Sequence, residues 1–161
     1  MDEQTFLALY AATAKPLWAY LARLSGRPDV ANDLLQETYC RFLTARSRPV
    51  EPAQARPYLF RIATNLLHDR WRKGEDAPWS EPPETAFERD LDTQIDVRDL
   101  MLQLKPRERE LLWLAYVEGM THSEIARATG LHSMSIRILL FRARQKAAEL
   151  LGRKEPTVHE V

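Results

Sequence analysis

Apolar residues recur at steps of three and four along most of the chain, a periodicity that predicts amphipathic helices rather than strands. The first stripe runs from Phe6 to Leu24 and is expected to end at Gly26. Pro16 interrupts this stripe. Because proline cannot donate a backbone hydrogen bond inside a helix, we expect a break or kink near Lys15.

A second helix is expected to begin at Asp29, because its carboxylate can accept the free N–H groups of a first helical turn. Its apolar face comprises Ala31, Leu34, Leu35, Thr38 and Phe42. Its opposite face presents Asp33, Gln36, Glu37 and Arg41. This polar face is either an ordinary solvated surface or a docking site for a basic surface of a partner.

A third helix is expected from about Pro57 to Lys73, after a loop marked by Pro49 and Pro52. Its inward positions are Leu59, Ile62, Ala63, Leu66 and Leu67. Three amphipathic helices within residues 1–73 predict a small bundle with a limited core.

The C-terminal part shows the same periodicity. Leu91 and Ile95 suggest a short helix leading to Leu104, and Pro106 is expected to open the next helix, which Gly119 stops. Thr121 and Glu124 have the spacing of a capping box for a short helix that ends at Gly130. A last helix is expected from about Ser133 to Leu151.

The residues around Gly130 predict a helix-turn-helix. Ala126 provides the small side chain where two helices cross, Gly130 the turn, and Ile136 the apolar lock on the second helix. Ile125, Leu131 and Leu140 extend that core. The second helix carries Arg137, Arg142, Arg144 and Lys146, and a basic helix after such a turn suits a DNA major groove. The alternative is an αα-hairpin with a solvated basic face.

The formal net charge of zero conceals three blocks. Residues 1–73 carry 11 basic and 7 acidic side chains, residues 74–99 carry 2 and 9, and residues 100–161 carry 10 and 7. The acidic, proline-containing middle block predicts a linker, either a plain spacer or a strap that competes with nucleic acid. The fold class is therefore expected to be all-α, with two small helical lobes joined by a flexible acidic linker.

Composition limits the classes of protein to which this chain can belong. The single cysteine, Cys40, excludes an internal disulfide, and no apolar run is long enough for a transmembrane helix. No secretory signal is evident, so a cytoplasmic protein is expected. No catalytic triad, metal cluster or paired-carboxylate pocket is recognisable, so we expect neither an enzyme nor a cofactor or metal. His122 and His132 are expected to be cap or surface groups rather than metal ligands.

The third predicted helix carries a second pattern that is typical of nucleic-acid binding. Arg61, Asn65, His68 and Arg72 share one face, and the aromatic residues interleaved with this basic segment are Tyr58, Phe60 and Trp71. Cations neutralise phosphates and aromatic rings stack on unpaired bases, so this pattern suits single-stranded nucleic acid. Taken alone, the same stripe can be a solvated helix face.

In their order along the chain, these signals resemble the extracytoplasmic-function (ECF) group of bacterial sigma factors. Residues 33–38, with 41–42, resemble the family's core-polymerase-binding segment. Residues 55–67 and 69–73 resemble its promoter-melting segment, and motifs within 104–144 resemble its fourth conserved region. Three motifs in the right order make the resemblance far more specific than any one alone.

The resemblance implies a transcription initiation factor in which residues 1–73 bind polymerase and melt the minus-ten element. Residues 74–99 would be the linker, and residues 100–153 would read the minus-thirty-five element. The implied partners are promoter DNA, core RNA polymerase through the clamp helices of its largest subunit and its flap, and an anti-sigma factor. The implied location is the bacterial cytoplasm, at the nucleoid, without membrane insertion.

The resemblance also implies roles for single residues. The polymerase-binding residues would be Asp33, Leu34, Gln36, Glu37 and Arg41. The minus-ten residues would be Tyr58, Arg61, Asn65, Arg70, Trp71 and Arg72, with Asn65 and the loop before Pro57 capturing a flipped base. The minus-thirty-five residues would be His132, Ser133, Arg137, Phe141, Arg142 and Arg144.

Some residues depart from the family pattern. His132 and Ser133 stand where the family commonly begins its recognition helix with serine, and Ile138 and Leu139 stand where polar or basic residues are frequent. Asn32 and His122 replace a frequent glutamate and tyrosine. We therefore expect either a weak minus-thirty-five contact or an unusual promoter sequence.

The main alternative is a stand-alone helix-turn-helix regulator of the response-regulator type, which would bind duplex DNA without polymerase. Its members share features with residues 106–110 and 119–126 of this chain. That interpretation leaves residues 29–73 without a purpose, and no receiver pattern of alternating strands and helices is present.

Overall fold

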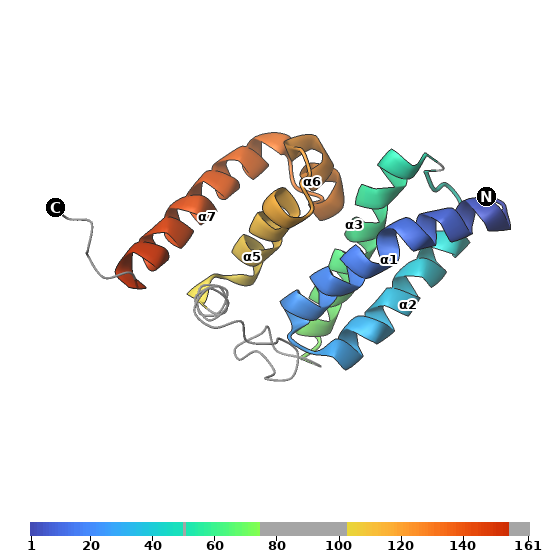
Figure 1. Cartoon of the computed structure of the whole chain (residues 1–161), viewed down its shortest axis with the longest axis horizontal. Coiled ribbons are helices and arrows are strands. Elements are labelled where there is room, and N and C mark those ends of the chain that lie inside the picture. The colour runs from blue at the N-terminus through green and yellow to red at the C-terminus, as the bar shows by residue number, and fades with distance from the viewer. Residues whose placement is uncertain (50, 75–102, 155–161) are drawn as a thin grey trace.

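The computed structural model describes residues 1–49, 51–74 and 103–154, and every regular element within these residues is helical. The elements are α1 (Glu3–Ser25), α2 (Pro28–Thr44), α3 (Pro52–Arg72), α5 (Pro106–Leu112), the π-helical segment η2 (Trp113–Val117), α6 (His122–Thr129) and α7 (Ser133–Lys154). The all-α fold class is confirmed (Figure 1). Apart from Gly74, the predicted linker lies outside the described residues, as does the short helix suggested by Leu91 and Ile95.

Helix α1 is continuous through Pro16, so of the predicted break or kink the break does not occur. Asp2 caps its start by accepting a hydrogen bond from the Thr5 amide at 2.8 Å, and Gly26 ends it with a left-handed φ of 71°. Proline removes only one hydrogen bond. The fully buried side chains of Leu17 and Tyr20, which follow it directly, hold the helix in place by tertiary packing.

Helix α2 begins at Pro28 and not at Asp29. Proline suits the first helical position because its missing N–H would have no partner there, and Arg27 occupies the cap position. Asp29 lies in the first turn and pairs with Arg27 at 2.8 Å. The hydrogen bond from Arg27 lowers the pKa of Asp29, so this carboxylate supports the helix start without capping it.

Helix α3 begins at Pro52, so the predicted start at Pro57 is wrong. The predicted loop is present around Pro49, but it ends before Pro52. Pro52 takes the tolerated first position, whereas Pro57 lies inside the helix and is buried. The segment that sequence analysis offered as a base-capturing loop is therefore the first part of α3.

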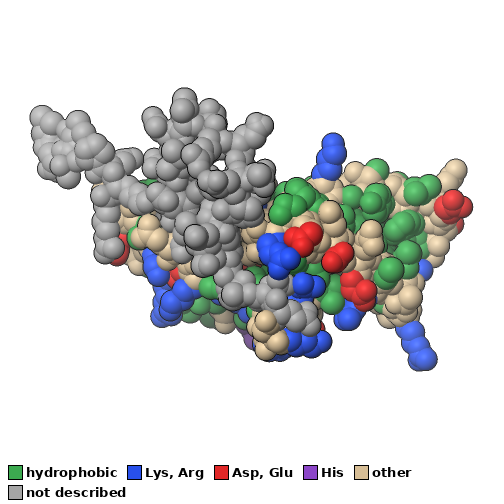
Figure 2. Space-filling model, turned by 90° about the horizontal axis from the view of Figure 1, so that it is seen from below, with side chains coloured by type: hydrophobic (Ala, Val, Ile, Leu, Met, Phe, Trp, Pro, Cys, Tyr) green, Lys and Arg blue, Asp and Glu red, His purple; other side chains and the backbone are tan. Residues whose placement is uncertain are grey.

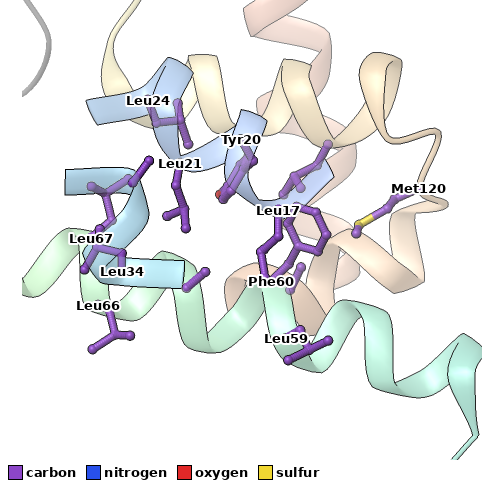
Figure 3. Packing of buried hydrophobic residues seen from close by; sticks show 14 of the residues in the cluster. Leu17, Tyr20, Leu21, Leu24, Leu34, Leu59, Phe60, Leu66, Leu67 and Met120 are labelled. Carbon is purple, nitrogen blue, oxygen red and sulfur yellow. The ribbon is translucent and has the colours of Figure 1, made fainter. Parts of the chain in front are cut away.

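The two lobes share one hydrophobic core. In the N-terminal lobe, α1, α2 and α3 pack together, and Phe60 of α3 meets Tyr20 of α1 edge to face at 5.1 Å. From the C-terminal lobe, Leu111, Leu114 and Met120 join the same cluster. Figure 3 shows Met120 directed toward Leu17 and Phe60. The lobes are thus in contact within the described residues, with α6 lying against α3.

Phe60 corrects one expectation. Sequence analysis placed it among the aromatic residues available to stack on unpaired bases, but its side chain is completely buried. Tyr58 and Trp71 are half-buried. Phe60 therefore stabilises the core between the lobes and cannot contact nucleic acid in this arrangement.

The N-terminal lobe exposes apolar side chains on its outer surface. In Figure 2 hydrophobic side chains gather over the half of the molecule formed by α1 to α3, and several Lys and Arg side chains project from it. Leu7, Tyr10 and Leu43 are the large apolar residues exposed on α1 and α2. None of the helices in the described residues combines the length and apolar character needed to cross a bilayer.

Candidate functional site

The helix-turn-helix is built as its sequence signals predict. The Thr121 hydroxyl accepts a hydrogen bond from the Glu124 amide at 3.1 Å, and the Glu124 carboxylate accepts one from the Thr121 amide at 2.9 Å. This reciprocal capping box fixes the start of α6. Gly130 ends α6 with a φ of 81°, which a side chain would disfavour. The capping box and the glycine turn are both confirmed.

Packing sets the direction of α7. Ile125 of α6 and Ile136 and Leu140 of α7 are buried, whereas Leu131 and Ala126 are half-buried. Outside these contacts α7 exposes Ser133, Arg137, Phe141, Arg142 and Arg144, and His132 is exposed just before the helix begins. Arg144 also donates a hydrogen bond from Nη1 to the Tyr116 hydroxyl at 3.0 Å. The predicted minus-thirty-five residues are thus all accessible, on α7 or just before it.

Replacing Thr121 by alanine is expected to destabilise the helix-turn-helix by about 1 kcal/mol, because the hydroxyl satisfies an otherwise free amide of the first turn. Urea unfolding of the full chain, followed by far-ultraviolet circular dichroism, measures this loss. Serine at the same position should recover most of it. An unchanged midpoint in the alanine variant would show that the capping box contributes nothing to stability.

The polar face of α2 is exposed as predicted. Asp33, Gln36, Glu37 and Arg41 are exposed, and Arg41 pairs with Glu37 at 3.0 Å. Leu34, the remaining member of the predicted polymerase-binding set, is buried beneath this face. It therefore contributes packing under the surface rather than surface itself.

A hollow of about 260 Å³ joins this face to the end of α3. Its α2 side includes Asp33, Glu37 and Arg41, and its α3 side includes Asp69 and Arg70. The predicted polymerase-binding residues other than Gln36, and one predicted minus-ten residue, thus border the same depression. On the other side of the α2 polar face, the Trp18 indole donates a hydrogen bond to the Asn32 side chain at 2.8 Å, a contact between α1 and α2 that sequence analysis missed.

The C-terminal lobe borders the basic face of α3, on which Arg61, Asn65 and Arg72 stay exposed and His68 is half-buried. A second hollow, of about 500 Å³, is lined by Tyr58, Arg61 and Asn65 of α3 and by Arg127 of α6. The Arg61 guanidinium lies over Gly130 so closely that a Cβ atom there would be 2.9 Å from its Cζ atom. Arg61 is therefore engaged at the turn of the helix-turn-helix.

Two polar contacts also link the lobes. Arg56 donates from Nη2 to the backbone oxygen of Glu118 at 2.6 Å and to its carboxylate at 3.1 Å. His68 forms a short hydrogen bond with Glu110, whose side chain is fully buried and also pairs with Arg107 at 3.2 Å. A buried carboxylate needs such partners, because desolvation otherwise makes its charge costly.

Burial shifts the pKa of two polar side chains in the core, Tyr20 and Arg109. Burial, and secondarily the negative charge of Glu110, raise the pKa of Tyr20 well above its ordinary value, so its hydroxyl stays protonated. That hydroxyl bonds Thr64 of α3 at 2.7 Å. Burial lowers the pKa of Arg109, whose Nε donates to the Leu104 carbonyl at 3.0 Å.

The end of α3 holds the remaining predicted minus-ten residues. The Trp71 ring is stacked on His68 at a centroid distance of 5.4 Å, and Arg72 pairs with Asp69. Tyr58 packs against Phe42 of α2 at 5.9 Å. Asn65 and Arg72 are exposed, while Tyr58, Arg70 and Trp71 are half-buried. The structure thus brings these residues onto one helix but leaves them unequally accessible.

An apolar groove in the C-terminal lobe was not anticipated. It has a volume of about 530 Å³, and its lining is mainly Leu104, Leu112, Trp113, Tyr116, Val117 and Leu151, with Arg23 and Arg144 also contributing. The sequence feature that could have indicated this groove is the apolar run at 111–117. A helix cannot bury every residue of such a run against one neighbouring face. Tyr116 and Val117 are 62% and 59% exposed, so part of this run is free to meet a partner.

Two further histidines, His122 and His132, lie at the helix-turn-helix. His122 is the first residue of α6 and is half-buried, and His132 is exposed just before α7. Across the described parts of the chain, no three His, Cys, Asp or Glu side chains come together as metal ligands would.

Comparison with protein families gives two matches, in order along the chain. Residues 9–76 match the model described as "Sigma-70 region 2", and residues 94–146 match "Sigma-70, region 4". The first match contains the bundle with the α2 polar face and the α3 basic face. The second contains the helix-turn-helix.

Similar full-length proteins agree with these matches. The chain is 31% identical over 161 residues to RNA polymerase sigma factor CarQ of Myxococcus xanthus, covering 95% of this chain and 92% of that protein. It is 28% identical over 180 residues to the ECF sigma factor SigE of Mycolicibacterium smegmatis, covering 94% of this chain and 70% of that protein.

Two solved structures share the fold. One is the sigma factor RpoE of Bartonella quintana in complex with the anti-sigma factor NepR, with a TM-score of 0.65, 22% identity and coverage of 95% of this chain and 98% of that one. The other belongs to a PhyRSL–NepR complex from Sphingomonas sp. Fr1, with a TM-score of 0.74, 16% identity and coverage of 96% and 94%.

Proposed function

This chain belongs to the sigma-70 family of RNA polymerase sigma factors, in its ECF group, and from that premise we propose how its two lobes divide the work. The chain is a transcription initiation factor that binds core RNA polymerase and directs promoter recognition. The observation that carries this function is the presence of both sigma-70 regions, in order, in one chain. A stand-alone helix-turn-helix regulator is not favoured, because it would leave the region 2 match without a role.

Residues 1–73 form the lobe that binds polymerase and opens the minus-ten element, residues 74–99 the linker, and residues 100–153 the lobe that reads the minus-thirty-five element. The exposed polar face of α2 supports the first assignment, with Asp33, Gln36, Glu37 and Arg41 as its surface residues. The exposed basic face of α7 supports the last. Catalysis remains with the polymerase, so no enzymatic residues are assigned to this chain.

The minus-ten element is held by the basic face of α3. Arg61, Arg70 and Arg72 bind the backbone, Asn65 accepts a flipped base, and Tyr58 and Trp71 provide aromatic surface. Unstacking a base costs a few kcal/mol, and stacking worth about 1–3 kcal/mol per base offsets it. The exposure of Asn65 and Arg72 supports these roles.

The described arrangement is a closed form of the free chain. Arg61 lies on Gly130 and α6 lies along α3, so promoter DNA cannot reach the whole α3 face until the lobes separate. Binding to polymerase supplies the free energy for this opening, since the two lobes then contact separate stretches of the promoter. An anti-sigma factor that holds the lobes together would inhibit initiation.

The apolar groove of the C-terminal lobe receives the polymerase flap. Its apolar lining, with Tyr116 and Val117 exposed, suits the hydrophobic face of a partner helix. Polymerase would then contact both lobes, through α2 and through this groove. These partners place the working protein in the cytoplasm, at the nucleoid.

Run-off transcription tests the function as a whole. Purified chain and core RNA polymerase are incubated with a pool of genomic promoter fragments, and transcripts are mapped. Initiation at a defined set of start sites that requires both components supports the proposal. Selective binding to duplex DNA by the chain alone, without any directed initiation, would instead support the stand-alone regulator.

Arg137→Ala is expected to weaken promoter binding by about 1–3 kcal/mol, because an arginine on this face of α7 can make a bidentate contact with a guanine edge. Holoenzyme binding is measured on promoters with single substitutions in the minus-thirty-five element. Relaxed specificity at one position identifies a base contact. An equal loss on every promoter would assign Arg137 to the phosphate backbone instead.

A further inference from the structure

An apolar row runs along the exposed face of α7, between the basic side chains that are expected to meet DNA. Met134, Ile138 and Phe141 are 78%, 51% and 53% exposed. Their spacing of four and three residues puts them in one row along the helix. The buried residues Ile136 and Ala143 lie on the opposite side, so this row points away from the helix-turn-helix core.

Cationic side chains border the apolar row on both sides. At about 100° per residue, Arg137 and Arg144 fall on one flank of the row and Arg142 falls on the other. All three are exposed, and no Asp or Glu occurs among residues 133–146. An apolar row between two cationic edges matches a DNA groove, in which base edges lie between two phosphate backbones.

The row favours one kind of base contact. In the major groove each of the four bases shows hydrogen-bonding groups, but only thymine adds an apolar group, its C5-methyl. Ile138 has no hydrogen-bonding group in its side chain and Met134 has only a weakly accepting thioether sulfur, so neither makes a strong hydrogen bond to a guanine or adenine edge. A thymine methyl, by contrast, is removed from water when it meets them.

We propose that this chain selects its minus-thirty-five element partly by thymine methyl groups, read by Met134 and Ile138 with Phe141 at the end of the row. The inference rests on the proposed function, in which α7 enters the major groove. It also explains why Ile138 departs from the family pattern. The apolar side chain would set the sequence preference, and not only remove a polar contact.

Charge distinguishes DNA from a protein partner at this face. A protein groove that accepted the row would also have to neutralise Arg137, Arg142 and Arg144 on both flanks. The two backbones of a duplex supply that negative charge at the required places. Promoter DNA is therefore the occupant to which we commit.

The test replaces thymine by uracil, which removes only the C5-methyl group. The minus-thirty-five element is first selected from a random pool with holoenzyme made from the full chain and core polymerase. Each thymine of the selected element is then changed to uracil singly, and holoenzyme binding is measured. We expect a three- to fivefold loss at one or two positions, on the order of one buried methyl group.

Variants assign the effect to the row. Ile138→Ala and Met134→Ala should bind thymine and uracil promoters equally at the position that each side chain contacts. Arg142→Ala is the matched control, because loss of a phosphate contact should weaken binding to both promoters by the same factor. All three side chains are exposed, so the fold should persist in each variant.

Two results overturn the inference and leave the proposed function intact. One is a selected element without thymine. The other is equal binding of thymine and uracil promoters by the unmodified holoenzyme at every position while directed initiation continues. Failure of the holoenzyme to initiate on any promoter is a different result, and it overturns the proposed function itself.

Discussion

Replacing Gln36 and Glu37 together by alanine is expected to weaken binding to core RNA polymerase on the order of 100-fold without unfolding the chain. Both side chains are exposed on α2, and neither contributes to the core. Alanine is the best helix former, so α2 itself should be unaffected. The affinity is measured by titrating labelled chain with core polymerase at fixed salt.

The size of this effect follows from the position of the two residues. Gln36 and Glu37 lie between Asp33 and Arg41, in the middle of the polar face of α2. Central residues of an interface become fully desolvated on binding, and their loss leaves groups of the partner unpaired. Removing Glu37 also frees Arg41, which it holds at 3.0 Å, and places an unpaired cation opposite a basic partner surface.

Glu3→Ala with Gln4→Ala is a matched control, because it removes the same two residue types from exposed positions at the start of α1. This control should bind polymerase normally. If the α2 variant also co-purifies with core enzyme at unchanged affinity, the assignment of this face to polymerase is wrong.

Local chemistry made several features predictable from sequence. The capping box of Thr121 and Glu124 and the turns at Gly26 and Gly130 depend on residues a few positions apart, so their signals are complete within a short segment. Proline was less informative. Pro16 and Pro57 both lie inside helices, because tertiary packing outweighs the single hydrogen bond that each removes.

The face of α3 could not be predicted from one stripe. Leu59, Ala63 and Leu67 were expected inside and are buried, but Phe60 and Thr64 are buried as well. Phe60 and Thr64 both contact Tyr20 of α1, and α3 also packs against α2 and α6. A single apolar stripe predicts one buried face, whereas a helix with several neighbours buries more than one sector.

Charged residues at the lobe interface illustrate the same difficulty. Arg56 and His68 resemble members of a solvated basic stripe, and Glu118 and Glu110 resemble surface acids. Their pairing joins residues separated by 62 and 42 positions. No local pattern encodes such a contact, so the closed form emerges only when the lobes are seen together.

The second large effect concerns this closed form. Arg56→Ala with His68→Ala is expected to raise the free chain's affinity for single-stranded minus-ten DNA on the order of tenfold. The double variant removes both polar links between the lobes and leaves Glu110 buried with Arg107 as its remaining ion-pair partner. Glu110 and Glu118 each lose a hydrogen-bond partner in the closed form, which costs about 1–3 kcal/mol per buried group, and opening of the lobes relieves that cost by returning the carboxylates to water.

The expected gain in DNA affinity is informative, because the loss of positive charge alone would lower that affinity. The variant loses an arginine and a histidine from the basic helix, which by itself should weaken DNA binding. A gain therefore requires that the competent, open state was scarce before the substitution. Apparent affinity scales with the fraction of open chains, so a rise from about a few per cent open to mostly open suffices for a tenfold gain.

Lys15→Ala with Arg46→Ala is the matched control, because it removes two cations at exposed positions away from the lobe interface. It should bind single-stranded DNA equally or more weakly. Small-angle X-ray scattering of the free chains supplies the second measurement, since opening the lobes raises the radius of gyration. If the double variant stays compact and binds DNA no better than the control, then Arg56 and His68 do not hold the lobes closed, and the masked α3 face requires another mechanism to be exposed.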